Sequence, residues 1–133
     1  MNKTVYIIRG PSGSGKTTLA KQLCAENNIF EADQYFTQDG VYEFDPSKLT
    51  DAHADCFARF RSAVIEERGP LAVSNTSTRL HEYFRYGQLA EEHGYRVVEI
   101  ICGMNLSARE LQKLSQHTVP LHTIENQVWR FER

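Results

Sequence analysis

The sequence has few cysteines, no excess of positive charge and no long hydrophobic run, and each absence excludes a class of protein. Cys24, Cys56 and Cys102 are widely separated in 133 residues and form no C-x-x-C pair, which disfavours a disulfide framework and fits reduced thiols. A net charge of −2 lacks the basic field that coating of duplex nucleic acid requires. The apolar run at residues 5–8 is too short for a signal peptide or a membrane span. We therefore expect a cytoplasmic protein without a membrane partner.

Repeats, low-complexity tracts and metal-binding patterns are also missing. The five histidines lack H-E-x-x-H or any other ligand spacing. We interpret the only tryptophan, Trp129, and its neighbour Phe131 as anchors for the last helix rather than a platform for base stacking. What remains is 41% hydrophobic and 11% aromatic, with dispersed charges. This composition predicts a single globular domain over residues 1–133.

Residues 10–17, Gly-Pro-Ser-Gly-Ser-Gly-Lys-Thr, match the phosphate-binding pattern G-x-x-x-x-G-K-[ST]. They follow an apolar run and precede a helical pattern. The glycines allow backbone N–H groups to surround phosphate oxygens, the lysine adds a mobile positive charge, and the threonine hydroxyl is the usual Mg²⁺ ligand. The sequence therefore predicts a nucleoside triphosphate site formed by Gly10, Ser12, Gly13, Ser14, Gly15, Lys16, Thr17 and Thr18, with Thr17 as the metal ligand and Lys16 also catalytic.

Short apolar runs alternate with helical patterns along the whole chain. The runs predict strands at 4–9, 29–32, 71–73 and 96–102. The helical patterns lie at 16–26, 46–69 and 78–93, with a short helix opened by a capping box at 107–110 and a last helix after residue 120. This order predicts an α/β fold in which helices cover both faces of a parallel sheet. The active site is expected at the carboxyl edge of that sheet.

The segment at residues 34–46 has no helical period. An Asp-Gly pair at 39–40 lies between aromatic-rich flanks and is a hairpin signal. The segment is therefore either a flap over the site, which His53 could face, or a surface loop whose aromatic side chains pack down.

Polar residues at the ends of two predicted strands are the next candidates. Phosphoryl transfer needs a carboxylate that orients or deprotonates the acceptor hydroxyl, and Asp33 follows the second strand. We predict Asp33 as the catalytic base and an acceptor contact; the alternative is a turn residue or an indirect Mg²⁺ ligand. After the third strand, Asn75 could bind a metal-bound water or the substrate, and Arg79 could meet a phosphate. The alternative is an ordinary helix cap with a solvated arginine.

Six segments recur in the order of a known group of proteins: residues 9–20 around the phosphate loop, Glu-Ala-Asp-Gln-Tyr-Phe at 31–36, Tyr-Glu-Phe-Asp at 42–45 with Leu49 and Ala52-His53 downstream, Ser-Asn-Thr-Ser at 74–77, Gly-Tyr-Arg-Val at 94–97 and His-Thr-Val-Pro at 117–120. In this order the chain resembles P-loop kinases of the polynucleotide-kinase-like group. The resemblance implies a P-loop NTPase fold with an adenylate-kinase-like sheet, and ATP with Mg²⁺ as the cofactors. It also implies transfer of the γ-phosphate to a hydroxyl, typically a nucleic acid 5′-OH. By position, Asp33 matches the family's base, and Lys16 and Thr17 match its phosphate and metal contacts.

Two departures from the family pattern concern the third strand and the lid. Serines at 74 and 77 replace the outer residues of a motif that usually reads Asp-Asn-Thr-Asn, and Leu-Ser at 114–115 replaces Arg-Asn. The second change removes a phosphate-binding arginine. Arg109 and Lys113 are four residues apart, so they share a face of the helix that begins near 107 and could supply catalytic charge. The alternative is that this face is solvated.

Three functions remain open from the sequence. The first is an ATP-dependent kinase acting on a hydroxyl of a nucleic acid end, a nucleoside or a nucleotide. The second is a kinase of another small molecule, such as a sugar, because the fold serves many acceptors. The third is a nucleotide-binding module that hydrolyses slowly or not at all, as the two departures would allow.

Overall fold

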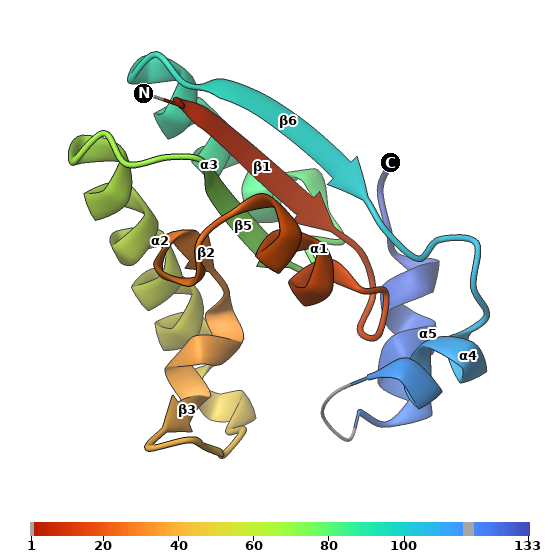
Figure 1. Ribbon diagram of the computed structural model, residues 1–133. Coiled ribbons are helices and arrows are strands. Elements are labelled where there is room, and N and C mark those ends of the chain that lie inside the picture. Colours follow the sequence, from red (N-terminus) through yellow and green to blue (C-terminus); the bar gives the residue numbers. More distant parts are fainter. Residues whose placement is uncertain (1, 116–118) are drawn as a thin grey trace.

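A four-stranded parallel sheet forms the centre of the fold (Figure 1) in the computed structural model, which describes residues 2–115 and 119–133. The strand order is β2-β5-β1-β6, with β1 (Thr4–Arg9), β2 (Ile29–Phe30), β5 (Leu71–Asn75) and β6 (Arg96–Ile101). Strand β1 pairs with neighbours on both sides, and Val5 lies opposite both Leu71 and Val97. The loop that follows β1 is thereby placed in the middle of the carboxyl edge.

Helices cover both faces of the sheet, which confirms the predicted α/β fold (Figure 1). One face is covered by α1 (Lys16–Leu23), and the other by α2 (Leu49–Ile65) and α3 (Leu80–Glu92). Successive residues of β5 serve the two sides: Leu71 and Val73 join the larger core under α2 and α3, whereas Ala72 joins the smaller core under α1. A strand buried on both faces has little room for polar residues.

Two short helices, α4 (Ala108–Leu114) and α5 (Leu121–Trp129), pack against each other beyond the ends of β1 and β6 (Figure 1). The predicted capping box opens α4, because Ser107 Oγ accepts from the N–H of Glu110 at 3.2 Å. Residues 117 and 118 of the His-Thr-Val-Pro motif lie outside the described residues. In the part of the chain that the structure describes, no helix is both long and apolar enough to cross a membrane.

The segment between β2 and α2 forms a 3₁₀ helix, η2 (Ala32–Phe36), and the predicted hairpin of β3 (Thr37–Gln38) and β4 (Val41–Tyr42). Its turn residues have positive φ, 51° at Asp39 and 77° at Gly40. The buried ring of Phe36 contacts the rings of Tyr42 and Phe44, with centroids 6.5 and 5.2 Å apart. The predicted hairpin is therefore present and its aromatic side chains pack together, whereas its role as a flap over the site stays a prediction.

Several predicted boundaries and one predicted contact were wrong. Helix α1 ends at Leu23, the second strand has two residues, and residues 46–48 form a separate 3₁₀ turn before α2. Trp129 does not anchor the last helix, because 89% of its surface is exposed. Phe131 does pack inward, and its ring lies 4.6 Å from the guanidinium of Arg9.

Arg9, the last residue of β1, has a fully buried guanidinium that joins the sheet to the end of the chain. It donates to Glu99 Oε1 at 2.8 Å, to the carbonyl of Ser77 at 2.9 Å and to the carbonyls of Thr78 and Glu132. Aromatic rings from α3 and from the C-terminal tail lie against it, those of Tyr83 and Phe131. Burial of a charge is tolerated here because its donors meet oxygen acceptors.

We expect Arg9→Met to lower the free energy of unfolding by about 3 kcal/mol, since each buried carbonyl left without its donor costs about 1–3 kcal/mol. Urea denaturation followed by circular dichroism measures the change. Arg61→Met, at an exposed arginine of α2, is the matched control and should change stability by less than about 0.5 kcal/mol. Equal effects of the two substitutions would contradict the role given to Arg9.

Candidate active site

The loop between β1 and α1 has the geometry of a phosphate cradle. Gly13 has φ of 82°, and a Cβ atom there would lie 1.9 Å from the carbonyl oxygen of Leu111, so only glycine fits. Gly15 has φ of 88° and precedes α1 without a side-chain cap on the helix. The amides of the first turn are therefore left for an anion, which the positive end of the helix dipole also favours.

Lys16 lies inside the same cradle. Its Nζ donates to the carbonyl of Pro11 at 3.0 Å. Burial lowers the pKa of this amine to about 8, while Glu31, Cys102 and Asp33 act in the opposite direction. A phosphate group bound here would stabilise the charged amine, because an opposite charge at close range offsets the cost of burial.

Thr17 and Glu31 bring two oxygen ligands together beside the cradle. Thr17 Oγ1 donates to Glu31 Oε2 at 2.7 Å. Among the described residues there is no cluster of three or more His, Cys, Asp or Glu side chains suited to a metal. One hydroxyl and one carboxylate nevertheless fit Mg²⁺, which commonly takes one or two protein oxygens and completes its shell with phosphates and waters. Thr17 and Glu31 could hold that ion.

Asp33 lies on η2 and lines the same cavity as Lys16 and Thr17. Its negative charge acts on three neighbouring groups, as their pKa values show. Burial lowers the pKa of Lys16 and of His53, and Asp33 opposes that effect in both. Burial raises the pKa of Tyr42 to about 12, and Asp33 adds to the rise. The carboxylate is thus placed between the phosphate loop, the hairpin and α2.

Asn75 fixes the turn that carries Asp33. Its Oδ1 accepts from the N–H of Ala32 at 2.8 Å, and its Nδ2 donates to Cys56 Sγ at 3.8 Å. The side chain also lines the cavity. The contact with substrate or metal-bound water stays a prediction, whereas the positioning contact is present.

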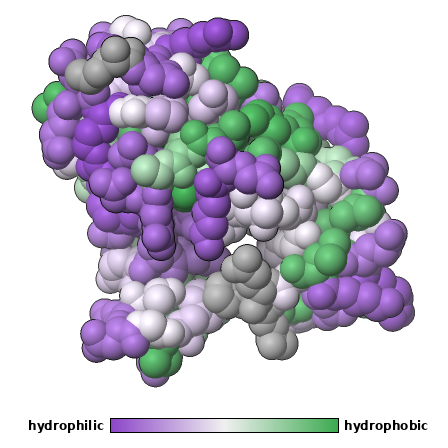
Figure 2. Space-filling model, in the orientation of Figure 1, coloured by the Kyte–Doolittle hydropathy of each residue, from purple (hydrophilic) through white to green (hydrophobic). Residues whose placement is uncertain are grey.

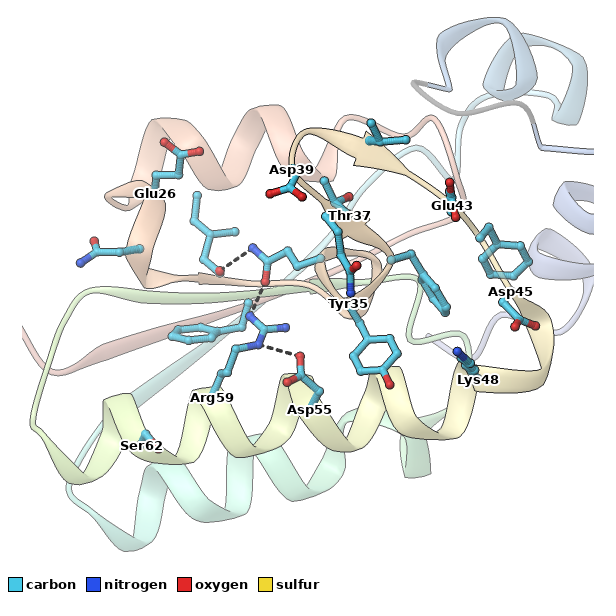
Figure 3. A pocket seen from close by; sticks show the side chains of 18 of the residues that line it. Glu26, Tyr35, Thr37, Asp39, Glu43, Asp45, Lys48, Asp55, Arg59 and Ser62 are labelled. Atoms are coloured by element: carbon cyan, nitrogen blue, oxygen red, sulfur yellow. Dashed lines mark hydrogen bonds and ion pairs between the residues drawn. The ribbon is translucent and has the colours of Figure 1, made fainter.

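Arg59 of α2 holds the same turn from the opposite side. Its side chain lines a second hollow of about 1380 Å³, which Figure 3 shows from close by. Its guanidinium donates to Gln34 Oε1, to the carbonyl of Glu31 at 3.1 Å and to Asp55 Oδ2 at 2.8 Å. Gln34 in turn donates to the carbonyl of Ile29 at 3.0 Å. This network restrains the backbone between Glu31 and Gln34, and with it both carboxylates of the site.

The cavity itself has a volume of about 1670 Å³ and runs along the carboxyl edge of the sheet. Its two ends are formed by the hairpin side and by the α4–α5 side of the molecule, between which the surface is hollowed (Figure 2). The phosphate loop lies between these ends. There is room for a nucleotide and for an acceptor next to it.

The predicted site residues divide into two sets. Residues 12–18, Asp33 and Asn75 line the cavity, so the structure brings the predicted loop and the predicted base together. Gly10, the first residue of the predicted loop, is not part of this lining, and its N–H donates to the carbonyl of Thr76 at 3.2 Å.

Three predicted cationic residues are not brought to the cavity. Arg79 points to Glu132, 3.8 Å from its carboxylate, instead of into the site. Arg109 and Lys113 are exposed on α4 and are not part of the lining. Helical spacing correctly placed the last two close together on one helix, but it could not tell which way that helix faces.

Sequence reasoning missed several polar residues of the lining, among them Glu31, Arg85, Gln127 and Arg130. Glu31 could have been found, because it precedes Asp33 by two residues at the same strand end. Gln127 and Arg130 belong to the last helix and its end, more than a hundred residues from the phosphate loop, and no local pattern connects them to it. Gln127 Oε1 accepts from the N–H of Ser12 at 2.9 Å.

A glycine cradle between a central parallel strand and a helix, with a lysine and a hydroxyl–carboxylate pair beside it, defines a kinase-like P-loop NTPase domain. A family model described as "AAA domain" matches residues 5–133. The chain belongs to this family.

Known proteins with similar sequence or structure support this class. NEDD4-binding protein 2 of Homo sapiens is 30% identical over an alignment of 134 residues, which covers 97% of this chain and 8% of that protein. The chain thus spans a small fraction of that relative's length. A gluconokinase from Sinorhizobium meliloti 1021 has a TM-score of 0.64 at 16% identity, over 98% of this chain and 76% of that one.

Two further solved structures share the fold. Kti12 from Chaetomium thermophilum, in complex with ADP-AlF3, has a TM-score of 0.63 at 17% identity, covering 97% of this chain and 80% of that one. The tunicamycin resistance protein of Deinococcus radiodurans has a TM-score of 0.58 at 21% identity, and the match covers 97% of this chain and 80% of that one. At these identities the likeness shows the fold, and the narrower resemblance to polynucleotide kinases stays a prediction.

We expect Glu31→Gln to weaken Mg²⁺ binding to the protein–nucleotide complex by about 10-fold, in the range measured for groups that support a bound metal. A neutral amide replaces the carboxylate while the shape is kept. Titration of Mg²⁺ at fixed ATP, followed by a fluorescent nucleotide, measures the change. Glu26→Gln, at an exposed residue of the same cavity lining, is the control. An unaltered Mg²⁺ requirement in Glu31→Gln would remove Glu31 from the metal site.

Proposed function

We propose that this domain is an ATP-dependent phosphotransferase that moves the γ-phosphate of ATP to a hydroxyl group. One observation carries the proposal: a carboxylate, Asp33, lies in the same cavity as the phosphate loop and close enough to Lys16 to influence its pKa. A module that only binds a nucleotide has no need of a base at that place. Phosphoryl transfer needs one to orient and deprotonate the acceptor.

The residues of the cavity divide the reaction between them. Amides of the phosphate loop and Lys16 bind the β- and γ-phosphates, and Thr17 with Glu31 would hold Mg²⁺, which neutralises charge on those phosphates. Asp33 accepts the proton of the acceptor hydroxyl while the oxygen of that hydroxyl forms a bond to the γ-phosphorus. The bond from that phosphorus to the β–γ bridging oxygen breaks, and ADP leaves with the electron pair. Asn75 and Arg59 keep the turn of Asp33 in place.

A nucleic acid end, a nucleoside or a nucleotide is our first proposal for the acceptor, because the motif order resembles the polynucleotide-kinase-like group. A sugar or another small neutral molecule is the second, and the charge of the cavity favours it. Around His53 and Glu82 the lining carries two carboxylates, of Asp33 and Glu82, and two arginines, Arg85 and Arg130, so the charges of the two signs balance and leave a weak field for a polyanion. A cytoplasmic location stays a prediction.

We expect Lys16→Ala to weaken ATP binding by at least about 10-fold, or about 1.4 kcal/mol, and to abolish turnover without unfolding the domain. Isothermal titration calorimetry and circular dichroism measure the two quantities. Wild-type ATP affinity should also fall as the pH rises above about 8, because the free amine has a pKa of about 8 and then loses the charge that ATP needs.

That pH dependence should be absent in Lys16→Ala and present in Lys48→Ala, which changes an exposed lysine outside this cavity. Unchanged ATP affinity in a folded Lys16→Ala protein would remove the nucleotide site from the proposal.

We expect Asp33→Asn to keep ATP affinity but to lower phosphoryl transfer by about 100-fold or more, as the loss of a general base does. Labelled ATP is incubated with 5′-OH oligonucleotides, nucleosides and sugars, with a no-acceptor control. Label in one class identifies the acceptor, and the substitution should then reduce that transfer.

Asp39→Asn is the matched control for this test, because Asp39 lies at the hairpin turn and borders the second hollow rather than the active-site cavity. Full transfer activity in Asp33→Asn would reduce Asp33 to a turn residue. No transfer by the wild-type protein to any acceptor would favour the binding module.

A further inference from the structure

The chain around Arg130 is fixed to the active-site edge at two points. Before it, the buried side chain of Gln127 accepts a hydrogen bond from the N–H of Ser12 in the phosphate loop. After it, the N–H of Glu132 donates to the carbonyl of Thr78 at 2.6 Å. The carbonyl of Glu132 accepts from the buried guanidinium of Arg9. The four residues between these anchors have little freedom to move away from the cavity.

Arg130 lines the cavity together with the phosphate loop, and within residues 2–115 and 119–133 it makes no ion pair. Its charge acts on Glu82 of α3, which lines the same cavity. The pKa of Glu82 is lowered: burial raises it, but hydrogen bonds from Thr78 and Arg79 and the charge of Arg130 outweigh that effect. Glu82 Oε1 accepts from those two donors at 2.7 and 2.8 Å, and the ion pairs of the described residues include none between Glu82 and Arg130.

We propose that Arg130 binds the γ-phosphate of ATP, an inference that rests on the phosphotransferase function proposed above. A guanidinium presents several N–H donors in one plane and suits phosphate oxygens better than a lysine does. Phosphoryl transfer places negative charge on the γ-phosphate oxygens, where a second cation besides Lys16 is of most value. The C-terminal segment thus contributes a charge to a site that the N-terminal loop begins.

Other cations are less well placed for this role. Arg109 and Lys113 lie outside the lining, and the lid position that faces the cavity is the apolar Leu114. Arg85 does line the cavity, but its guanidinium lies 4.3 Å from the ring of Phe57 and donates to a backbone carbonyl of α2. It therefore belongs to the acceptor end.

Binding measurements without an acceptor test the proposal independently of transfer activity. We expect Arg130→Ala to weaken binding of the non-hydrolysable ATP analogue AMPPNP, with Mg²⁺, by about 10-fold or more, as for loss of a charged phosphate contact, and binding of ADP by less than about 3-fold. The difference arises because ADP lacks the γ-phosphate. Arg130→Lys should restore part of the affinity for AMPPNP.

Arg133→Ala, at an exposed arginine three residues further on and outside the lining, is the control and should leave both affinities unchanged. Circular dichroism should show the same melting temperature for all variants. Equal losses for AMPPNP and ADP, or no loss for either, would overturn the assignment. Failure of the wild-type protein to phosphorylate any acceptor would count against the proposed function but would not alter these binding results.

Discussion

The buried guanidinium of Arg9 is the interaction on which the arrangement of the site depends. It lies at the carboxyl end of the central strand, one residue before the phosphate loop, and binds backbone carbonyls from the loop after β5 and from the end of the chain. Three segments that are far apart in the sequence therefore meet at one charge. A side chain buried this deeply can stay charged only if its acceptors stay in place, so the same contacts that satisfy Arg9 also set the positions of the cavity walls.

A second constraint acts on the turn that carries the two carboxylates. Glu31 is the N-cap residue of the 3₁₀ helix η2, and Asp33 lies in its first turn, which a capping box between Glu31 and Gln34 closes. Two neighbours hold this turn in addition: the amide of Asn75 on one side and the guanidinium of Arg59 on the other. Asn75 and Arg59 thus set the positions of the two carboxylates by holding the backbone that carries them. Their positions explain how a chain without a carboxylate at the end of β5 can still present a fixed pair of acids next to the phosphate loop.

The sequence alone predicted the features that depend on residues close together along the chain. The phosphate loop, the parallel sheet and Asp33 at the cavity follow from short motifs and from the alternation of strands and helices, and the structure places all three as expected. Predictions that needed a direction in space were less successful. Helical spacing put Arg109 and Lys113 on one face of α4, but the orientation of α4 depends on packing against α5. The aromatic character of Trp129 suggested burial, whereas the inward contact comes from Phe131.

The contacts of Glu132 also determine which residues a shorter form of this domain must keep. The carbonyl of Glu132 accepts from Arg9, its N–H donates to Thr78, and its carboxylate accepts from the N–H of Leu80. The ring of the preceding residue, Phe131, covers the guanidinium of Arg9. A fragment cut after α5 would retain each helix and strand of the described residues, but it would remove the ring of Phe131 and the carbonyl of Glu132 that contact the buried guanidinium of Arg9. When this domain is excised from a longer chain, or joined to another, the boundary therefore has to be drawn beyond the last hydrogen bond and not at the last helical residue.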